Sequence, residues 1–284
     1  MRLSVNSEVL SDRFGDERTI EMLKRAGFDC IDYTFLKSAS KEMYGENYKG
    51  YIQKLRMLLE KNNMTCNQAH APYELRYGDA FDVSDEKYAR LVRAIEAAAM
   101  LGAENIVVHS ITTPDDVDVF AYNLTFFKSL EPYCERFGIH VAIENLYDYK
   151  GNTFFHAARL HSPELLNMMI EKLQSPWFVV CIDVGHASLT GYEPDVLIRG
   201  FDNRTLKALH IHDNDYRFDW HTLPYMGKFD WDKIMRALRN INYQGDFTYE
   251  IGSYARKFQD DFVEEALCFA AKTGRYLMKK FTEV

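Results

Sequence analysis

Short apolar runs alternate with amphipathic stretches along the whole chain. β-branched and aromatic residues are common in the short runs, and the stretches between them repeat apolar residues at the spacing of a helix face. The short runs predict eight strands, at residues 3–7, 30–35, 65–69, 105–109, 140–145, 178–184, 206–212 and 246–251. The other stretches predict eight helices, at residues 17–25, 51–61, 85–101, 117–137, 163–173, 194–200, 231–240 and 260–280.

A helix between every pair of strands predicts parallel strands, and eight parallel strands close naturally into a barrel. The competing arrangement is an open doubly wound sheet, which usually has a glycine-rich phosphate-binding turn after its first strand. Here that turn has the sequence Asn6-Ser7-Glu8-Val9, without glycine. We therefore expect an α/β protein built as a (β/α)8 TIM barrel. No Pro-, Ser- or Gly-rich linker interrupts the chain, so residues 1–284 are expected to form a single domain.

Composition and charge narrow the class of protein. The 284 residues are 47% apolar and 27% charged, which is typical of a globular protein with a full core. The formal net charge of -8 disfavours a nucleic-acid partner, because phosphate-binding faces usually carry a basic excess. No apolar run approaches the roughly 20 residues that span a bilayer, and the first residues are too polar for a signal peptide. The five scattered cysteines are typical of buried thiols in a reducing compartment, so a cytoplasmic protein is expected.

Candidate chemistry gathers at the carboxyl ends of the predicted strands, where the active sites of such barrels lie. Three acids flanked by apolar residues stand there, together with six of the nine histidines. Imidazole and carboxylate together suit Mn²⁺, Co²⁺, Zn²⁺, Fe²⁺ or Mg²⁺. A cation would also compensate carboxylates that end apolar strands, since an unpaired buried carboxylate is costly. We expect a divalent metal site with the ligands Glu144, Asp183, His210 and Glu250.

Each of these residues also has a purely structural interpretation. A single strand-end histidine is often a hydrogen-bonded core residue, and a single acid is often a helix cap. The metal interpretation therefore depends on the whole set. His210 and His212 are two residues apart, so both point to the same side of their strand. Either could be the metal ligand, with the other facing substrate or a second ion, and the spacing leaves both arrangements open.

Several motifs resemble the xylose-isomerase-like barrel superfamily, over essentially the whole chain. The most specific are Ile143-Glu144-Asn145, Asp183-Val184-Gly185-His186-Ala187, His210-Ile211-His212-Asp213-Asn214-Asp215 and Asp219-Trp220-His221. The segment from Leu223-Pro224 through Gly227 to Asp230-Trp231 resembles that family's glycine turn before the seventh helix. The superfamily contains sugar and sugar phosphate isomerases and epimerases, and also the endonuclease IV DNA-repair enzymes.

The resemblance to the epimerases implies a function for individual residues. Glu144, Asp183, His210 and Glu250 match a four-ligand metal site, in which the two glutamates also act as acid and base on opposite faces of the sugar carbon. His186 is then expected to touch substrate oxygens, with His212 beside it, and Arg217 stands where some epimerases bind substrate. The ion would stabilise an enediolate after proton removal. Return of the proton to the opposite face gives epimerisation and return to the neighbouring carbon gives isomerisation, and the sequence leaves both open.

The resemblance to endonuclease IV implies more metal ions. In addition to the four ligands above, five residues have counterparts in its three-zinc site and could hold further ions: His70, His109, His186, Asp219 and His221. Tyr73 also stands where the repair enzymes carry a tyrosine. Against a nuclease, Leu146-Tyr147-Asp148-Tyr149-Lys150 replaces a small glycine-rich loop, and Asp183-Val184-Gly185-His186 replaces Asp-Thr-Cys-His. The acids Asp213, Asp215 and Asp219 would also repel a phosphate backbone unless metals neutralise them.

We therefore predict a metal-dependent isomerase or epimerase that binds a small-molecule sugar or sugar phosphate and uses Mn²⁺, Co²⁺, Mg²⁺ or Zn²⁺. A zinc-dependent nuclease for abasic sites in DNA is the alternative. Trp220, Tyr147, Phe35 and Tyr73 are candidates for an apolar wall against the sugar. The last helix has Phe262, Phe269 and Tyr276 at near-helical spacing and could pack on the barrel or on a partner chain, so a homo-oligomer stays open.

Overall fold

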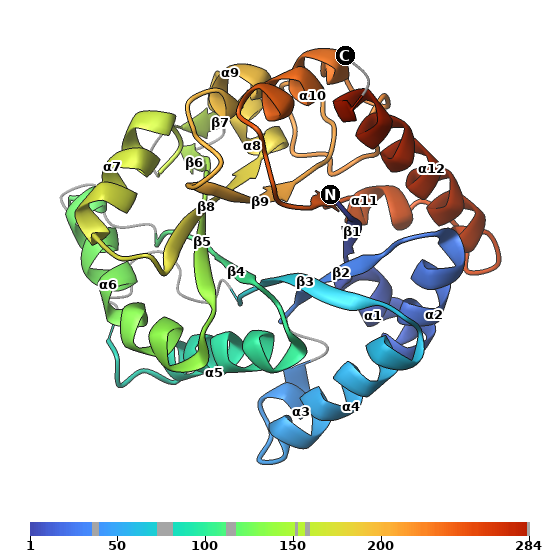
Figure 1. The fold of residues 1–284 in the computed structure, drawn as a ribbon, viewed down its shortest axis with the longest axis horizontal. Coiled ribbons are helices and arrows are strands. Elements are labelled where there is room, and N and C mark those ends of the chain that lie inside the picture. The colour runs from blue at the N-terminus through green and yellow to red at the C-terminus, as the bar shows by residue number, and fades with distance from the viewer. Residues whose placement is uncertain (36–39, 73–81, 112–117, 151–152, 157–159, 283–284) are drawn as a thin grey trace.

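Eight parallel strands form the centre of the molecule in the computed structural model, which describes residues 1–35, 40–72, 82–111, 118–150, 153–156 and 160–282 (Figure 1). The strands of this sheet, in chain order, are β1 (Leu3–Asn6), β2 (Cys30–Thr34), β3 (Thr65–His70), β4 (Asn105–Val108), β5 (His140–Glu144), β8 (Phe178–Asp183), β9 (Leu206–His210) and β10 (Phe247–Tyr249). Their order in the sheet is β10-β1-β2-β3-β4-β5-β8-β9.

The two edge strands of this sheet meet just beyond their carboxyl ends. Ile211 and Tyr249 form a parallel bridge, in which the Ile211 N–H donates to the Thr248 carbonyl at 2.8 Å and the Glu250 N–H donates to the Ile211 carbonyl at 3.0 Å. This contact brings β9 and β10 together at the end of the barrel where Glu250 lies. The predicted (β/α)8 barrel is confirmed, and each of the eight predicted strands is present.

Helices surround the strands in a ring (Figure 1). They are α1 (Glu8–Phe14), α2 (Asp16–Ala26), α3 (Ser40–Met43), α4 (Tyr48–Lys61), α5 (Glu86–Leu101), α6 (Val119–Phe137), α7 (Pro163–Leu173), α8 (Val184–Leu189), α9 (Pro194–Ile198), α10 (Trp231–Asn240), α11 (Gly252–Ala255) and α12 (Val263–Thr282). No helix within these described ranges is long and apolar enough to cross a membrane. The short helices α1, α3, α8 and α11 were not predicted, and neither was an antiparallel hairpin of β6 (Asp148–Lys150) and β7 (Thr153–His156).

The apolar core has two parts. The larger part lies between the strands and the helices and contains residues such as Ile143, Ile182 and Leu209. The smaller part joins Val107, Ala142, Val179, Cys181 and Ala208, from β4, β5, β8 and β9. Successive side chains of a strand point to opposite faces, so the smaller cluster lies on the inner face of the barrel. The residues two positions further along β5, β8 and β9 therefore face inward as well, above this cluster, at the carboxyl ends of the strands.

Candidate metal centre

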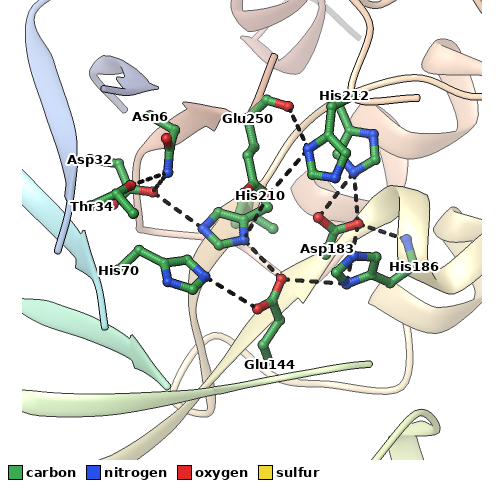
Figure 2. A network of polar contacts seen from close by, with 12 residues as sticks. Asn6, Asp32, Thr34, His70, Glu144, Asp183, His186, His210, His212 and Glu250 are labelled. Carbon is green, nitrogen blue, oxygen red and sulfur yellow. Dashed lines mark hydrogen bonds and ion pairs between the residues drawn. The ribbon is translucent and has the colours of Figure 1, made fainter. Parts of the chain in front are cut away.

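Four inward-facing polar residues meet above the small apolar cluster, at the ends of β5, β8 and β9 and directly after β10. They are Glu144, Asp183, His210 and Glu250, and one ligand atom from each lies within 4.8 Å of the others (Figure 2). His210 Nδ1 lies 2.9 Å from Glu144 Oε1 and 3.2 Å from Glu250 Oε2. The structure thus brings the four expected ligands together, with Glu144 and Glu250 both at the Nδ1 edge of the His210 ring.

The charges of this group suit a cation. Glu144, Asp183 and His210 are fully buried and the Glu250 side chain is 17% exposed, so three carboxylates share a space with little water. Glu250 Oε2 has an ion-pair contact with His210 but no hydrogen bond of acceptable geometry among the described residues. Clustered buried carboxylates repel one another unless a positive charge compensates them. Three carboxylates and one imidazole fit Mn²⁺, Mg²⁺, Co²⁺ or Zn²⁺.

Two carboxyls of this group, those of Glu144 and Asp183, are held in the ionised form that binds a cation. Burial opposes ionisation of Glu144, but the rings of His210 and His109 outweigh it and hold the pKa of the carboxyl well below its ordinary value. Burial would likewise raise the pKa of Asp183, but His186 and His212 lower it to about 2. Burial lowers the pKa of His109 to about 4. Near neutral pH these two carboxyls are therefore ionised and His109 is neutral. Burial lowers the pKa of His210, but its neighbours outweigh this effect and raise it well above the ordinary value of histidine. A metal ion would therefore have to displace a proton from the His210 ring.

Two further groups lie beside the four central residues. In the first, His109 Nε2 lies 2.7 Å and His70 Nε2 lies 3.8 Å from Glu144 Oε2. Glu144 therefore belongs both to this group and to the four central residues. In the second, Asp219 Oδ2 lies 2.9 Å from His221 Nε2 and 3.5 Å from His186 Nε2. Each group has three side chains able to hold a metal. All five residues expected to hold further ions therefore stand close enough to do so.

His210, the last residue of β9, and His212, two residues later, have different surroundings although both point inward. His212 Nε2 lies 3.0 Å from both carboxylate oxygens of Asp183, and its ring stacks on the His221 ring with centroids 4.1 Å apart. His210 is thus the histidine that faces Glu144 and Glu250, while His212 lies against Asp183. A Cβ at position 185 would lie 1.9 Å from His212 Cε1, so the ring occupies space that only glycine leaves free.

The helix-cap interpretation also applies to Asp183. Its Oδ1 accepts the His186 backbone N–H at 2.7 Å and so caps α8. The carbonyl and N–H of Asp183 are both held by the Asn145 side chain, at 2.9 and 2.7 Å. These bonds fix Asp183 and place His186 over the barrel, where His186 Nδ1 lies 3.0 Å from the Asn145 carbonyl oxygen. The Asp-x-x-His spacing therefore has two effects. Asp183 caps α8 through the His186 N–H, and the side chains of Asp183 and His186 both point into the barrel.

The residues expected to bind substrate or to form an apolar wall differ in their burial and contacts. The Arg217 side chain is exposed, and its backbone N–H donates to Asp215 Oδ1 at 3.0 Å. Tyr147, expected as part of an apolar wall, donates its hydroxyl to Asp219 Oδ2 at 3.1 Å, so its polar end faces the site. Phe35, another candidate for the wall, is buried and packs against Tyr33. The remaining wall candidates are Trp220, which is exposed, and Tyr73, which lies outside the described residues.

A family model described as a xylose isomerase-like TIM barrel matches residues 20–271 of the chain. The chain belongs to the xylose isomerase-like TIM barrel family. It is 33% identical over 170 residues to the uncharacterized protein y4fM of Sinorhizobium fredii. That match covers 56% of this chain and 51% of y4fM, so the chain spans about half the length of this curated relative.

Solved structures similar to this xylose isomerase-like barrel include a sugar epimerase and a zinc-binding protein. D-psicose 3-epimerase with D-tagatose, from Clostridium cellulolyticum H10, has a TM-score of 0.77 at 15% identity, over 98% of this chain and 99% of the epimerase. The IolI protein with a bound zinc atom has a TM-score of 0.77 at 15% identity, over 100% of both chains. At these identities the similarity shows a shared fold.

Asp213 of this xylose isomerase-like barrel lies in the interior, where the sequence did not predict it. Asp213 was expected to be part of an acidic loop that repels phosphate, but it is fully buried. Its Oδ2 accepts N–H groups from Tyr225 (3.0 Å) and the Trp231 indole (2.8 Å), and its Oδ1 accepts the Phe229 N–H at 3.2 Å. A Cβ at Gly227 would lie 2.1 Å from Asp213 Oδ1. Asp213 therefore holds together the loop that carries Asp219 and His221.

A second acid, Asp32, was missed entirely by the sequence analysis of this xylose isomerase-like barrel. It lies on β2, fully buried, and its Oδ2 is 3.3 Å from His210 Nε2. The signal was present, since an acid within the apolar run Cys30-Ile31-Asp32-Tyr33 is as unusual as the acids that identified the metal ligands. It stands before the strand end, however, where no ligand was sought.

Proposed function

We propose that this chain is a metal-dependent isomerase or epimerase of sugars or sugar phosphates. The observation that carries the proposal is that Glu144, at the end of β5, and Glu250, directly after β10, approach His210 Nδ1 at 2.9 and 3.2 Å. The family, and the similarity of this chain to D-psicose 3-epimerase, support a sugar as the substrate class. The similarity to the IolI protein, whose structure holds a zinc atom, supports a bound metal.

Glu144, Asp183, His210 and Glu250 would hold the ion. When bound, a divalent ion supplies Lewis-acid stabilisation of the charge that develops on adjacent sugar oxygens. Glu144 and Glu250 extend from different strands, so the carboxylate of one can take the proton from the sugar carbon while the other returns it. His186, beside Glu144 at 3.5 Å, is placed to hydrogen-bond a sugar hydroxyl. Whether the proton returns to the same carbon or to its neighbour decides between epimerisation and isomerisation.

Exchange of the substrate's α-proton tests this proposal. Ketoses such as D-tagatose and D-psicose would be incubated in D₂O with metal-loaded protein, and deuterium on the carbon next to the carbonyl would be measured by NMR. We expect exchange with the wild-type chain and none with Glu144→Gln. Glu104→Gln is the matched control, because the Glu104 side chain is 75% exposed beside Arg2, which lies just before β1. Near-normal exchange in Glu144→Gln would show that the paired-glutamate mechanism is wrong.

A second candidate function has one observation in its favour. Two further groups able to hold a metal, His70–His109–Glu144 and His186–Asp219–His221, lie beside the four central ligands, and the first shares Glu144 with them. Several metals in one site suit the hydrolysis of phosphate esters, because they stabilise both the attacking and the leaving oxygen. An endonuclease IV-like activity would require about three zinc ions per chain and cleavage of abasic DNA. Metal analysis showing one ion per chain, with α-proton exchange on a sugar, would exclude it.

A further inference from the structure

Asp32 is a buried carboxylate beneath the candidate metal centre. It lies on the inner face of β2, and its Oδ2 accepts the side-chain amide of Asn6 at 3.4 Å (Figure 2). The same oxygen accepts the side-chain amide of Gln68 at 3.2 Å. The Gln68 side-chain amide also donates to the Leu209 carbonyl at 3.4 Å. The amide that orients Asp32 is therefore bonded to β9, the strand that ends at His210. Amide donors support a charged carboxylate, but two neutral donors only partly replace its lost hydration. The ion pair that the structure shows for Asp32 is with His210.

His210 lies between this carboxylate and the candidate ligands. Its Nε2 is 3.3 Å from Asp32 Oδ2, while its Nδ1 faces Glu144 and Glu250 on the other side of the ring. The ring plane is also restrained by stacking on His70, with centroids 5.5 Å apart and an interplanar angle of 14°. His210 Nε2 has no hydrogen bond of acceptable geometry among the described residues, and the polar contact that the structure shows for it is the 3.3 Å ion pair with Asp32 Oδ2.

We infer that Asp32 is a positioning residue for His210. It holds the ring proton on Nε2 and leaves the Nδ1 lone pair for the metal. A neutral imidazole binds metal through one nitrogen while its other N–H donates, and the acceptor of that N–H fixes the ring's tautomer and orientation. The negative charge of Asp32 also strengthens the bond between imidazole and cation. The inference rests on the metal site of the proposed function and adds to that site a residue outside its ligand set.

Metal affinity tests the inference directly. Metal-free wild type and Asp32→Asn would be titrated with Zn²⁺ against a competing chelator, and we expect the Asn variant to bind about 10- to 100-fold more weakly, the usual effect of removing such a partner. Asp195→Asn is the matched control. Asp195 is also a buried acid, but its partner is Arg199 at 2.5 Å and it lies on α9. The control should bind Zn²⁺ as wild type does.

A spectroscopic measurement separates positioning from a general loss of packing. In the Zn²⁺-loaded, ¹⁵N-labelled protein, His210 should show a slowly exchanging, downfield Nε2–H resonance. We expect this resonance to move upfield in Asp32→Asn, where the acceptor is neutral, and to disappear in Asp32→Ala. An Asp32→Asn variant with wild-type affinity and an unmoved resonance would overturn the inference alone. A wild-type chain that binds no divalent metal would overturn the proposed function together with it.

Discussion

Replacing Asp213 by asparagine tests how the loop that carries Asp219 and His221 is held. Three N–H groups converge on the Asp213 carboxylate, from the backbone of Tyr225 and Phe229 and from the Trp231 indole. A carboxylate only accepts hydrogen bonds, so it matches three donors. An amide of the same shape has one accepting oxygen and one donating NH₂ group, so at least one N–H must face another donor.

The magnitude follows from these contacts. With the asparagine oxygen turned toward Tyr225 and Trp231, two charge-assisted bonds become neutral ones, each losing about 1 kcal/mol. The NH₂ group then faces the buried Phe229 N–H, and an unsatisfied buried donor costs roughly 1–3 kcal/mol. The free energy of unfolding should fall by about 3–5 kcal/mol in total, a large part of the roughly 5–15 kcal/mol that stabilises a typical protein.

Urea unfolding of the metal-free protein measures this difference. The control is Asp215→Asn in the same loop, where Asp215 is only partly buried and its Oδ1 accepts the N–H groups of Arg217 and Phe218. Water can replace bonds at that position, so we expect the control to lose less than about 1 kcal/mol. A loss at Asp213 as small as at Asp215 would refute the conclusion that Asp213 holds the loop together.

Three other predictions concern packing, pH and metal. Gly185→Ala should lower the unfolding free energy by about 1–3 kcal/mol, because its Cβ would displace His212 from Asp183, and urea unfolding would detect this. The Arg204 side chain and the Thr205 N–H, despite partial burial, lower the pKa of Asp202 from 3.8 to about 2. Asp202 therefore stabilises the fold above about pH 4 and loses this effect as the pH falls through 2, so urea midpoints of wild type and Asp202→Asn should converge in acid. Saturating metal should stabilise the chain by roughly 4 kcal/mol at a free concentration 1,000 times Kd, and chelation should reverse the shift in Tm; an unchanged Tm would contradict a site in the folded state.

The long elements of the fold were predictable because their apolar periodicity is local. Each barrel strand consists mostly of buried residues, and α5, α6 and α12 each repeat an apolar face over several turns. The short elements carry no such repeat. α8 has six residues, all buried, and it begins because Asp183 caps it, so its sequence reads as a continuation of the preceding strand.

The candidate site was predictable to the extent that it depends on strand ends. Glu144 and Asp183 are inward-facing residues at the ends of apolar strands, and parallel strands bring such ends together. The contacts of Asp213 depend on how its loop folds back onto Trp231, 18 positions later, which no local pattern encodes. The choice between His210 and His212 likewise depends on which ring lies above Gly185, a matter of packing rather than of spacing.

The central claim is that Glu144, Asp183, His210 and Glu250 bind a divalent cation. Calorimetric titration of chelator-treated protein with Mn²⁺ tests it most directly, with wild type, Glu250→Gln and Glu104→Gln measured side by side. The account predicts saturable binding in wild type and Glu104→Gln, and binding at least tenfold weaker in Glu250→Gln. Absence of binding in wild type, or equal binding in all three proteins, would contradict it.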